Sequence, residues 1–245
     1  MHGETYINKV TETINEAWST QQEQLLRVSE VMAETIKRKS SVFVFGCSHA
    51  GMLAEEVFYR TGGLAIINPI FFSGVLLNTR PVTMTSELER LPGLGKIILE
   101  SNNLKSGDML ILHSNSGRNT VPIEMAVEAR QKGVFTVGFT SLKHSNSVTS
   151  RHPSGKHLCD VCDIVIDNCG VPGDAAIKLE GLAEMIGPTS TAVGVSLINS
   201  IVIETVEKLI ADGIVPPIFM SANLDGGDEH NKKIFDEYAD NIFYM

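Results

Sequence analysis

The sequence predicts a three-layer α/β fold, with a five-stranded parallel sheet of flavodoxin-like order and helices on both faces. Short runs of β-branched and aromatic residues recur along the chain, and amphipathic segments of helical period separate them. Strands that alternate with helices form βαβ units, and such units assemble into a parallel sheet that is covered on both sides. We therefore expect an α/β domain with its ligand site at the carboxyl ends of the strands.

The elements follow from the hydrophobic period in chain order. One or two amphipathic helices are expected to open the chain over 4–39, because apolar residues recur there at helical spacing. Strands are expected at 41–45, 64–70, 109–113, 134–140 and 163–167. Helices are expected at 51–60, 96–103 and 121–132, and a long apolar helix within 187–211. The segment 71–91 shows no clear period and carries Pro and Gly, which is typical of a functional or flexible connection.

Composition limits the domain organisation and the classes of partner. The chain has 245 residues, of which 43 % are hydrophobic and 20 % charged, as in globular proteins. Residues 1–40 are expected to form an N-terminal helical extension, and 41–245 the main domain with a C-terminal helical segment. The net charge is −9 and there is no Lys/Arg run, so nucleic acid is not an expected partner.

The sequence also shows no recognisable targeting signal. The first 20 residues lack the apolar core of a signal peptide, and no apolar run is long enough to cross a bilayer. Four cysteines are too few for a secreted disulfide scaffold of this size. The sequence therefore predicts a cytoplasmic protein with reduced thiols and no membrane partner.

The segment after the third expected strand, called here the 114–120 loop, has the composition of a phosphate-binding turn. It consists of Ser114, Asn115, Ser116, Gly117, Arg118, Asn119 and Thr120, and an expected helix follows it. The glycine allows a close backbone approach, the first N–H groups of the helix point at an anion, and the hydroxyls add donors. The alternative is that Asn119 or Thr120 only caps the helix.

A second loop of similar design, called here the 46–51 loop, follows the first expected strand. It contains Gly46, Cys47, Ser48, His49 and Ala50. In a sheet of flavodoxin-like order the ends of strands one and three lie side by side, so the two loops are expected to form one binding site. A tight strand-to-helix turn without a ligand is the alternative.

These motifs resemble the SIS (sugar isomerase) family, and more closely its bacterial members related to N-acetylmuramic acid 6-phosphate etherase. The resemblance rests on the Ser-x-Ser-Gly loop, the preceding Gly-Cys-x-His loop and the segments 53–56, 114–124, 167–174, 187–191 and 221–231. It implies binding of a phosphorylated sugar, isomerisation or elimination as the reaction, a homodimer or higher homo-oligomer, and no cofactor. The chain departs from the family pattern at Asn119, where Thr is usual, and at Ala50, where Ser is common.

A second polar wall is expected just before the long apolar helix. Thr189, Ser190 and Thr191 stand there, and ordinary helix capping is an equally good explanation from the sequence. The resemblance adds that hydroxyl-rich loops at this point face the sugar.

Acid–base groups are needed because isomerisation and elimination both move a proton next to a carbonyl. Glu89 is the favoured candidate, since it lies in the irregular segment that supplies a catalytic Glu in SIS enzymes. His230 and His49 are the second and third candidates. The alternatives are a solvated charge for Glu89 and a structural role for each histidine.

A metal site is not expected. Cys159 and Cys162 form a Cys-x-x-Cys with His152 and His157 nearby, which resembles part of a zinc site. A structural zinc site takes four ligands from paired motifs, and the second pair is missing here. Buried cysteines beside a strand also behave as small hydrophobic residues.

Three functions remain open from the sequence: an enzyme acting on a phosphosugar, a non-catalytic sugar-phosphate sensor, and a structural role. The residues before the first strand are too short and too acidic for a fused helix-turn-helix domain. The apolar face of the 187–211 helix is long enough for a dimer interface, and it fits packing on the sheet equally well; it comprises Val193, Val195, Leu197, Ile198, Ile201 and Val202.

Overall fold

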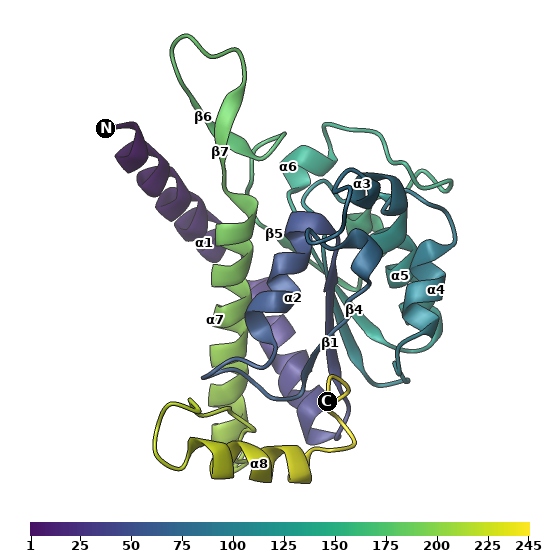
Figure 1. Ribbon diagram of the computed structural model, residues 1–245, viewed down its shortest axis with the longest axis vertical. Helices are drawn as coiled ribbons and strands as arrows, with labels where there is room; N and C mark the ends of the chain where they lie inside the picture. Colours follow the sequence, from purple (N-terminus) through teal and green to yellow (C-terminus); the bar gives the residue numbers. More distant parts are fainter.

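The computed structural model describes residues 1–245 and contains one five-stranded parallel sheet with helices around it (Figure 1). The strands are β1 (Val42–Gly46), β2 (Ile67–Pro69), β3 (Met109–His113), β4 (Phe135–Thr140) and β5 (Ile164–Asp167). Their order is β2-β1-β3-β4-β5, and every pair is parallel. The predicted α/β fold and flavodoxin-like order are confirmed, and β1 and β3 lie side by side at the switch point.

Eight α-helices accompany the sheet. They are α1 (His2–Lys37), α2 (Met52–Val57), α3 (Met84–Leu88), α4 (Leu94–Glu100), α5 (Thr120–Gln131), α6 (Leu142–Ser145), α7 (Ser190–Ala211) and α8 (Gly227–Glu237). Three 3-10 turns complete the set: η1 (Ser48–Gly51), η2 (Ser73–Val75) and η3 (Leu158–Asp160). The amphipathic start of the chain is thus one continuous helix, as the unbroken helical period over 4–39 allows.

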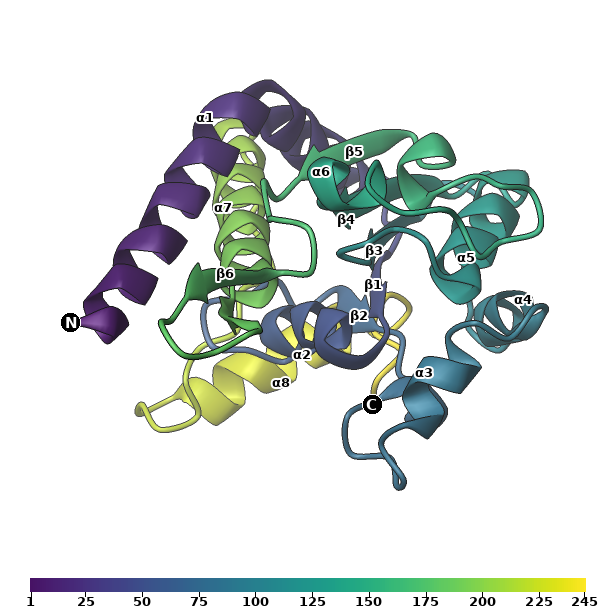
Figure 2. The same cartoon turned by 90° about the horizontal axis from the view of Figure 1, so that it is seen from above.

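The sheet separates two cores (Figure 2). Side chains alternate along β1, so Val42 and Val44 face α1, α2 and α7, whereas Phe43 and Phe45 face α4 and α5. All four side chains are buried, which explains why the strand reads as a continuous apolar run. This layering leaves the carboxyl edge of β1 and β3 as the place where loops from both layers meet.

Helices α1 and α7 pack along each other against one face of the sheet. The apolar face of α7 that the sequence left undecided is turned into this core: Val193, Leu197, Ile198, Ile201 and Val202 are all buried there. They share the core with Leu25, Val28 and Met32 of α1. The residues 1–40 therefore pack against the main domain through a helix whose inner face belongs to the main core.

Several elements were not predicted from the sequence. A two-stranded antiparallel hairpin, β6 (Ala175–Lys178) and β7 (Met185–Pro188), stands away from the body beside the first turns of α1. Most of its side chains are not buried, so it carries little hydrophobic pattern. Helices α3 and α6 are single turns, which leave no period to detect. The second strand is shorter than 64–70, because Leu64 bridges to Ile218 instead of pairing with β1.

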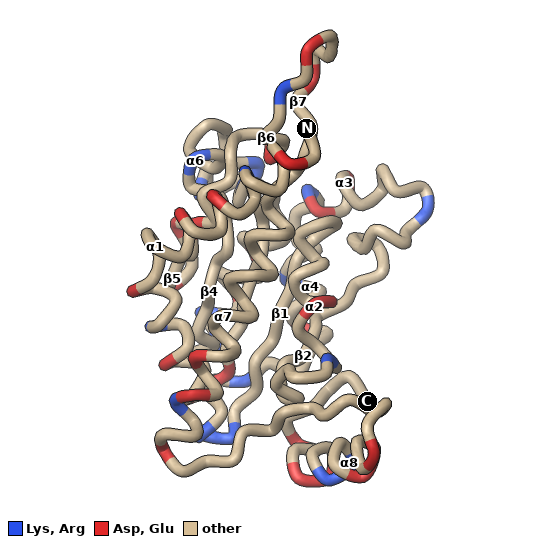
Figure 3. Tube along the Cα trace, turned by 90° about the vertical axis from the view of Figure 1, so that its left-hand side faces the viewer, with Lys and Arg blue, Asp and Glu red and all other residues tan.

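Helix α8 and the C-terminal tail lie at the end of the molecule opposite α3 and α6 (Figure 1). Phe243 of the tail stacks on Phe43 of β1, with 5.7 Å between ring centroids. None of the helices combines the length and apolar character that a membrane crossing requires. Acidic residues outnumber basic ones on the surface, and some of the basic ones lie near α6 (Figure 3).

Candidate functional site

A cavity of about 220 Å³, called here the site cavity, opens at the carboxyl ends of β1 and β3. Nine residues predicted from the sequence line it: Cys47, Ser48, His49, Glu89, Ser114, Asn115, Ser116, Asn119 and Ser190. The 46–51 and 114–120 loops therefore meet at one cavity, as the strand order requires. No lysine or arginine belongs to the lining.

The 114–120 loop turns sharply before α5. Gly117 has a φ of +61°, and its N–H donates to the carbonyl of Ser114 at 3.0 Å. A side chain at this glycine would lie 3.0 Å from the Thr140 hydroxyl, so the position needs both the left-handed backbone and the missing Cβ. The turn directs the start of α5 and the side chains of Ser114 and Ser116 to the cavity. The positive end of the α5 dipole lies at this turn and favours an anion there.

The 46–51 loop is closed by a direct backbone approach. Gly46 lies so near Ala50 that an added Cβ would overlap the Ala50 carbonyl. The Ala50 N–H donates to the carbonyl of Cys47 at 3.0 Å, and η1 follows. Burial, and then the nearby charge of Glu89, raise the pKa of the Cys47 thiol well above its usual range. This thiol is therefore protonated and weakly nucleophilic.

Gly46→Ala is expected to lower the free energy of unfolding by about 2 kcal/mol, because the new methyl group must displace backbone. Urea denaturation followed by circular dichroism measures the change. Gly3→Ala is the control, since Gly3 lies in α1 with open space around it. The control is expected to be neutral or slightly stabilising, because alanine favours a helix. Equal losses in both variants would contradict the close approach at Gly46.

Glu89 lies at the end of α3 and is tied to the 114–120 loop. The Asn119 amide donates to its carboxylate at 2.6 Å, and the Val121 N–H donates to its backbone carbonyl at 3.1 Å. Arg151 donates to the other side of the Asn119 amide at 2.7 Å. Burial raises the pKa of Glu89, and the nearby charges of Arg90 and Arg151 oppose that rise. The carboxylate is thus a stronger base than an exposed glutamate.

Three arginines, Arg118 of this loop together with Arg90 and Arg151, do not line the cavity. Burial and the charges of Arg118 and Arg90 lower the pKa of Arg151, which places the three guanidinium groups near one another. The Arg118 guanidinium donates to Thr149 at 3.4 Å, and its buried Nε has no partner. Such a group of cations attracts an anion toward the loop from outside the lining.

Two histidines that sequence reasoning missed line the site cavity. His113 ends β3, and burial is the main cause that lowers its pKa to about 4. Its Nδ1 lies 3.1 Å from the Ala50 carbonyl, so Nδ1 carries the proton of the neutral ring and Nε2 is left without a partner. His144 lies on α6; burial lowers its pKa, and its Nδ1 is also unpartnered.

Asp174 is the third lining residue that was missed. Its backbone has a φ of +67°, a conformation that is uncommon for residues other than glycine. Its carboxylate accepts from the Ser190 N–H at 2.8 Å, the Ser190 hydroxyl at 2.6 Å and the Thr189 N–H at 3.0 Å. The carboxylate therefore caps α7, and its negative charge meets the positive end of the helix dipole.

The other predicted residues do not line the site cavity. The Thr120 hydroxyl donates to the Arg151 carbonyl, and Thr189 is buried against Asp174. Thr191 lines a neighbouring cavity. His230 is on α8, at the other end of the chain's fold, where its Nε2 lies 2.9 Å from the Ile218 carbonyl. Its catalytic role stays a prediction, which the geometry of a single chain does not support.

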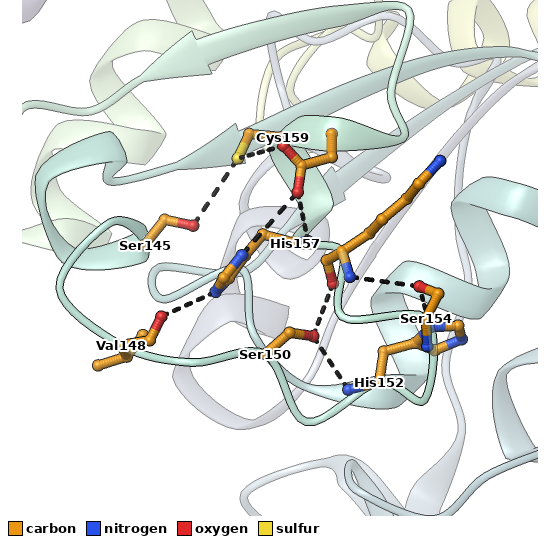
Figure 4. Close-up of polar contacts among 9 residues, drawn as sticks. Ser145, Val148, Ser150, His152, Ser154, His157 and Cys159 are labelled. Atoms are coloured by element: carbon orange, nitrogen blue, oxygen red, sulfur yellow. Dashed lines mark hydrogen bonds and ion pairs between the residues drawn. The ribbon is translucent and has the colours of Figure 1, made fainter.

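The histidine and cysteine side chains around Cys159 contact other residues of the same segment (Figure 4). His157 Nε2 lies 3.1 Å from the Val148 carbonyl, His152 Nδ1 lies 2.7 Å from the Ser154 hydroxyl, and the Cys159 sulfur lies 3.8 Å from the Ser145 hydroxyl. Nowhere do three His, Cys, Asp or Glu side chains form a group suited to a metal ion.

Comparisons with known proteins agree with this architecture. A UPF0309 protein of Shouchella clausii is 46 % identical over 242 residues, covering 99 % of this chain and 98 % of its own. A UPF0309 protein of Oceanobacillus iheyensis is 45 % identical and covers 98 % of each chain. The structure of phosphoheptose isomerase from Neisseria gonorrhoeae matches with a TM-score of 0.51 at 16 % identity, covering 82 % of this chain and 94 % of its own.

A second solved structure shares the fold. The Vibrio vulnificus NanR protein matches with a TM-score of 0.50 at 14 % identity, covering all of this chain and 71 % of its own. At such low identities, the matches with these two solved structures show only that the fold is shared. The family model described as SIS domain matches residues 5–141, which is more than half of the chain. Together with the strand order and the two loops, this match shows that the chain belongs to the SIS domain family.

Proposed function

We propose that the chain binds a phosphorylated sugar in the site cavity and moves a proton on it, as an isomerase or a lyase. The observation that carries this proposal is the position of Glu89. Its partly desolvated carboxylate lines the cavity and is held 2.6 Å from Asn119 at the end of the 114–120 loop. A base is thus fixed beside the place where the loop would hold a phosphate.

The phosphate would be bound by neutral donors. Ser114 and Ser116 offer hydroxyls, and the start of α5 adds the positive end of the dipole of a 12-residue helix. The arginines outside the lining supply attraction at longer range. A ligand anchored in this way would share the cavity with Glu89, Ser190 and Asp174, which also line it.

Proton transfer would follow from this placement. The Glu89 carboxylate takes the proton from the carbon next to the sugar carbonyl, and the electron pair moves into an enediol. In an isomerisation the proton returns to the neighbouring carbon; in an elimination a substituent one carbon further leaves. His144, which burial keeps neutral, lies on the same cavity and would exchange a proton with the sugar oxygens.

Ser116→Ala is expected to weaken the binding of sugar phosphates about tenfold, because one hydrogen bond to a charged group is lost. Titration calorimetry with hexose and N-acetylhexosamine 6-phosphates measures the change. Ser154→Ala is the matched control, since Ser154 lies in the exposed loop of Figure 4, outside the site cavity. Equal affinities for the wild type and Ser116→Ala, or no binding of any sugar phosphate to the wild type, would overturn the proposal.

A sensor that binds without turnover is the second candidate, and the Asn119–Glu89 hydrogen bond favours it. If Glu89 serves only to orient the Asn119 amide toward a phosphate, the carboxylate is structural. A solved structure of the NanR protein, which shares this fold, is described as a complex with ManNAc-6P. Binding of a sugar phosphate by the wild type without any conversion would favour the sensor.

Assembly into a homodimer or higher oligomer is part of the proposal. The inner face of α7 is used within the chain, so an interface would involve outward residues such as Ile203 and Ile210, which are 67 % and 60 % exposed. Light scattering of the purified chain measures the mass. A monomer at micromolar concentration would contradict this part. The relation to N-acetylmuramic acid 6-phosphate etherase and the cytoplasmic location stay predictions.

A further inference from the structure

A second cavity of about 500 Å³, called here the side chamber, adjoins the site cavity. His49 and Asp174 line both, so the two cavities share this part of their walls. The side chamber is more than twice as large as the site cavity, and a ligand confined to the phosphate end would leave it empty. Its other walls come from the start of α1, the start of α2, the end of β7 and the start of α7.

The walls of the side chamber are mostly carbon. Tyr6 and Met52 face it together with Pro188 and Ala192. The Tyr6 ring is fixed in place, because its hydroxyl donates to the Pro188 carbonyl at 2.7 Å and its edge lies against Gly187, where a Cβ would approach to 2.9 Å. Met52 is 37 % exposed, an apolar side chain in contact with water. Carbon groups of a ligand would displace that water with a gain in affinity.

Charge limits what the side chamber accepts. No lysine or arginine lines it, and its one carboxylate, Asp174, accepts hydrogen bonds at the N-terminus of α7. The positive end of that helix is therefore already matched by a negative charge, and a second anion would meet repulsion. The Thr191 hydroxyl and the His49 ring remain available to a neutral polar group such as an amide or an ether.

We infer that the phosphosugar of this site carries a neutral substituent with carbon surface, such as an acylamino or alkoxy group, which occupies the side chamber against Tyr6. The inference rests on the proposed function, because the phosphate end must sit in the site cavity for the substituent to reach past His49 and Asp174. It excludes substituents that end in a carboxylate or a second phosphate.

Titration calorimetry on the full chain tests this with matched ligands. One series carries N-acetyl, N-butanoyl or N-succinyl on glucosamine 6-phosphate; the other carries methyl, propyl or carboxyethyl as the glycoside of glucose 6-phosphate. In at least one series the longer neutral chain is expected to bind about tenfold tighter than the short one, since each buried methylene contributes roughly fourfold. The carboxylate of matched length is expected to lose that gain.

Variants of Tyr6 test whether the gain in affinity arises in the side chamber. Tyr6→Ala is expected to abolish the gain from the longer neutral chain. Tyr6→Phe keeps the ring and is expected to keep the gain. Ile7→Ala is the matched control, since the neighbouring Ile7 is 61 % exposed and does not line the chamber.

The outcomes separate the two proposals. If sugar phosphates bind but the longer neutral chains add nothing in either series, or Tyr6→Ala keeps the gain, the inference is overturned and the proposed function stands. If the carboxylate-ended ligand binds as tightly as its neutral match, the charge argument at Asp174 is wrong. If no sugar phosphate binds, the proposed function itself fails.

Discussion

Glu89→Gln is expected to lower the turnover of a sugar phosphate by about 10²–10⁴, the range that a positioned acid–base group contributes. Glutamine keeps an oxygen that can accept from the Asn119 amide, which donates to Glu89 at 2.6 Å. The variant therefore loses proton transfer and retains the shape of the site. Steady-state kinetics at saturating substrate measure the loss, and calorimetry with the same ligand is expected to show nearly unchanged affinity.

The control for this variant is Glu87→Gln, two residues away on α3 and exposed. Its turnover is expected to equal that of the wild type. The pH profile adds a second readout: burial raises the pKa of Glu89, so turnover should rise with pH through a midpoint above the ordinary glutamate value of 4.5. Loss of affinity together with turnover in Glu89→Gln would instead assign the carboxylate to binding.

Acidification is expected to destabilise the protein through His113. Burial lowers its pKa from 6.5 to about 4, so between these values the unfolded chain binds a proton that the folded chain does not. Stability is therefore complete above pH 6.5 and falls as the pH drops toward 4. The shift corresponds to about 3 kcal/mol for this group alone. Urea denaturation at a series of pH values measures it.

His113→Asn isolates this contribution. Asparagine keeps an N–H that can reach the Ala50 carbonyl, which the Nδ1 of His113 now contacts at 3.1 Å, and it does not titrate. Between pH 6.5 and 4 the variant is expected to lose about 3 kcal/mol less than the wild type. His2→Asn, at an exposed position near the N-terminus, is expected to follow the wild-type curve. Parallel curves for the wild type and His113→Asn would show that His113 is protonated in the folded chain.

The layers and the two loops were predictable because they depend on local pattern, whereas the strand order was expected only as the flavodoxin-like order of the fold class. The run Val42 to Phe45 is apolar on both faces, and the glycines at 46 and 117 stand where the chain must turn after a strand. Contacts between residues that lie far apart in the chain leave no such local pattern in the sequence. His113 looked like the last residue of a strand, and only the approach of Ala50 through the Gly46 turn fixes its tautomer.

The α7 wall shows the same limit. Thr189, Ser190 and Thr191 read equally as a cap or as a polar wall, and the structure divides them between the two roles. Asp174, whose carboxylate accepts from Ser190, lies 16 residues earlier in the chain. The hairpin of β6 and β7, which was not predicted, lies between the two residues in the sequence. A sharper signal existed in the run Gly173-Asp174, since aspartate after glycine is typical of a turn and tolerates a positive φ.

Deuterium exchange at carbon 2 of a bound sugar phosphate tests the central claim most directly, because isomerisation and elimination both begin with removal of that proton. The wild type is incubated in D₂O with the hexosamine 6-phosphate that binds most tightly, and proton NMR follows the carbon-2 signal. We predict loss of the signal in the wild type and its persistence in Glu89→Gln. A signal that persists in the wild type while the ligand is bound would contradict proton transfer by Glu89.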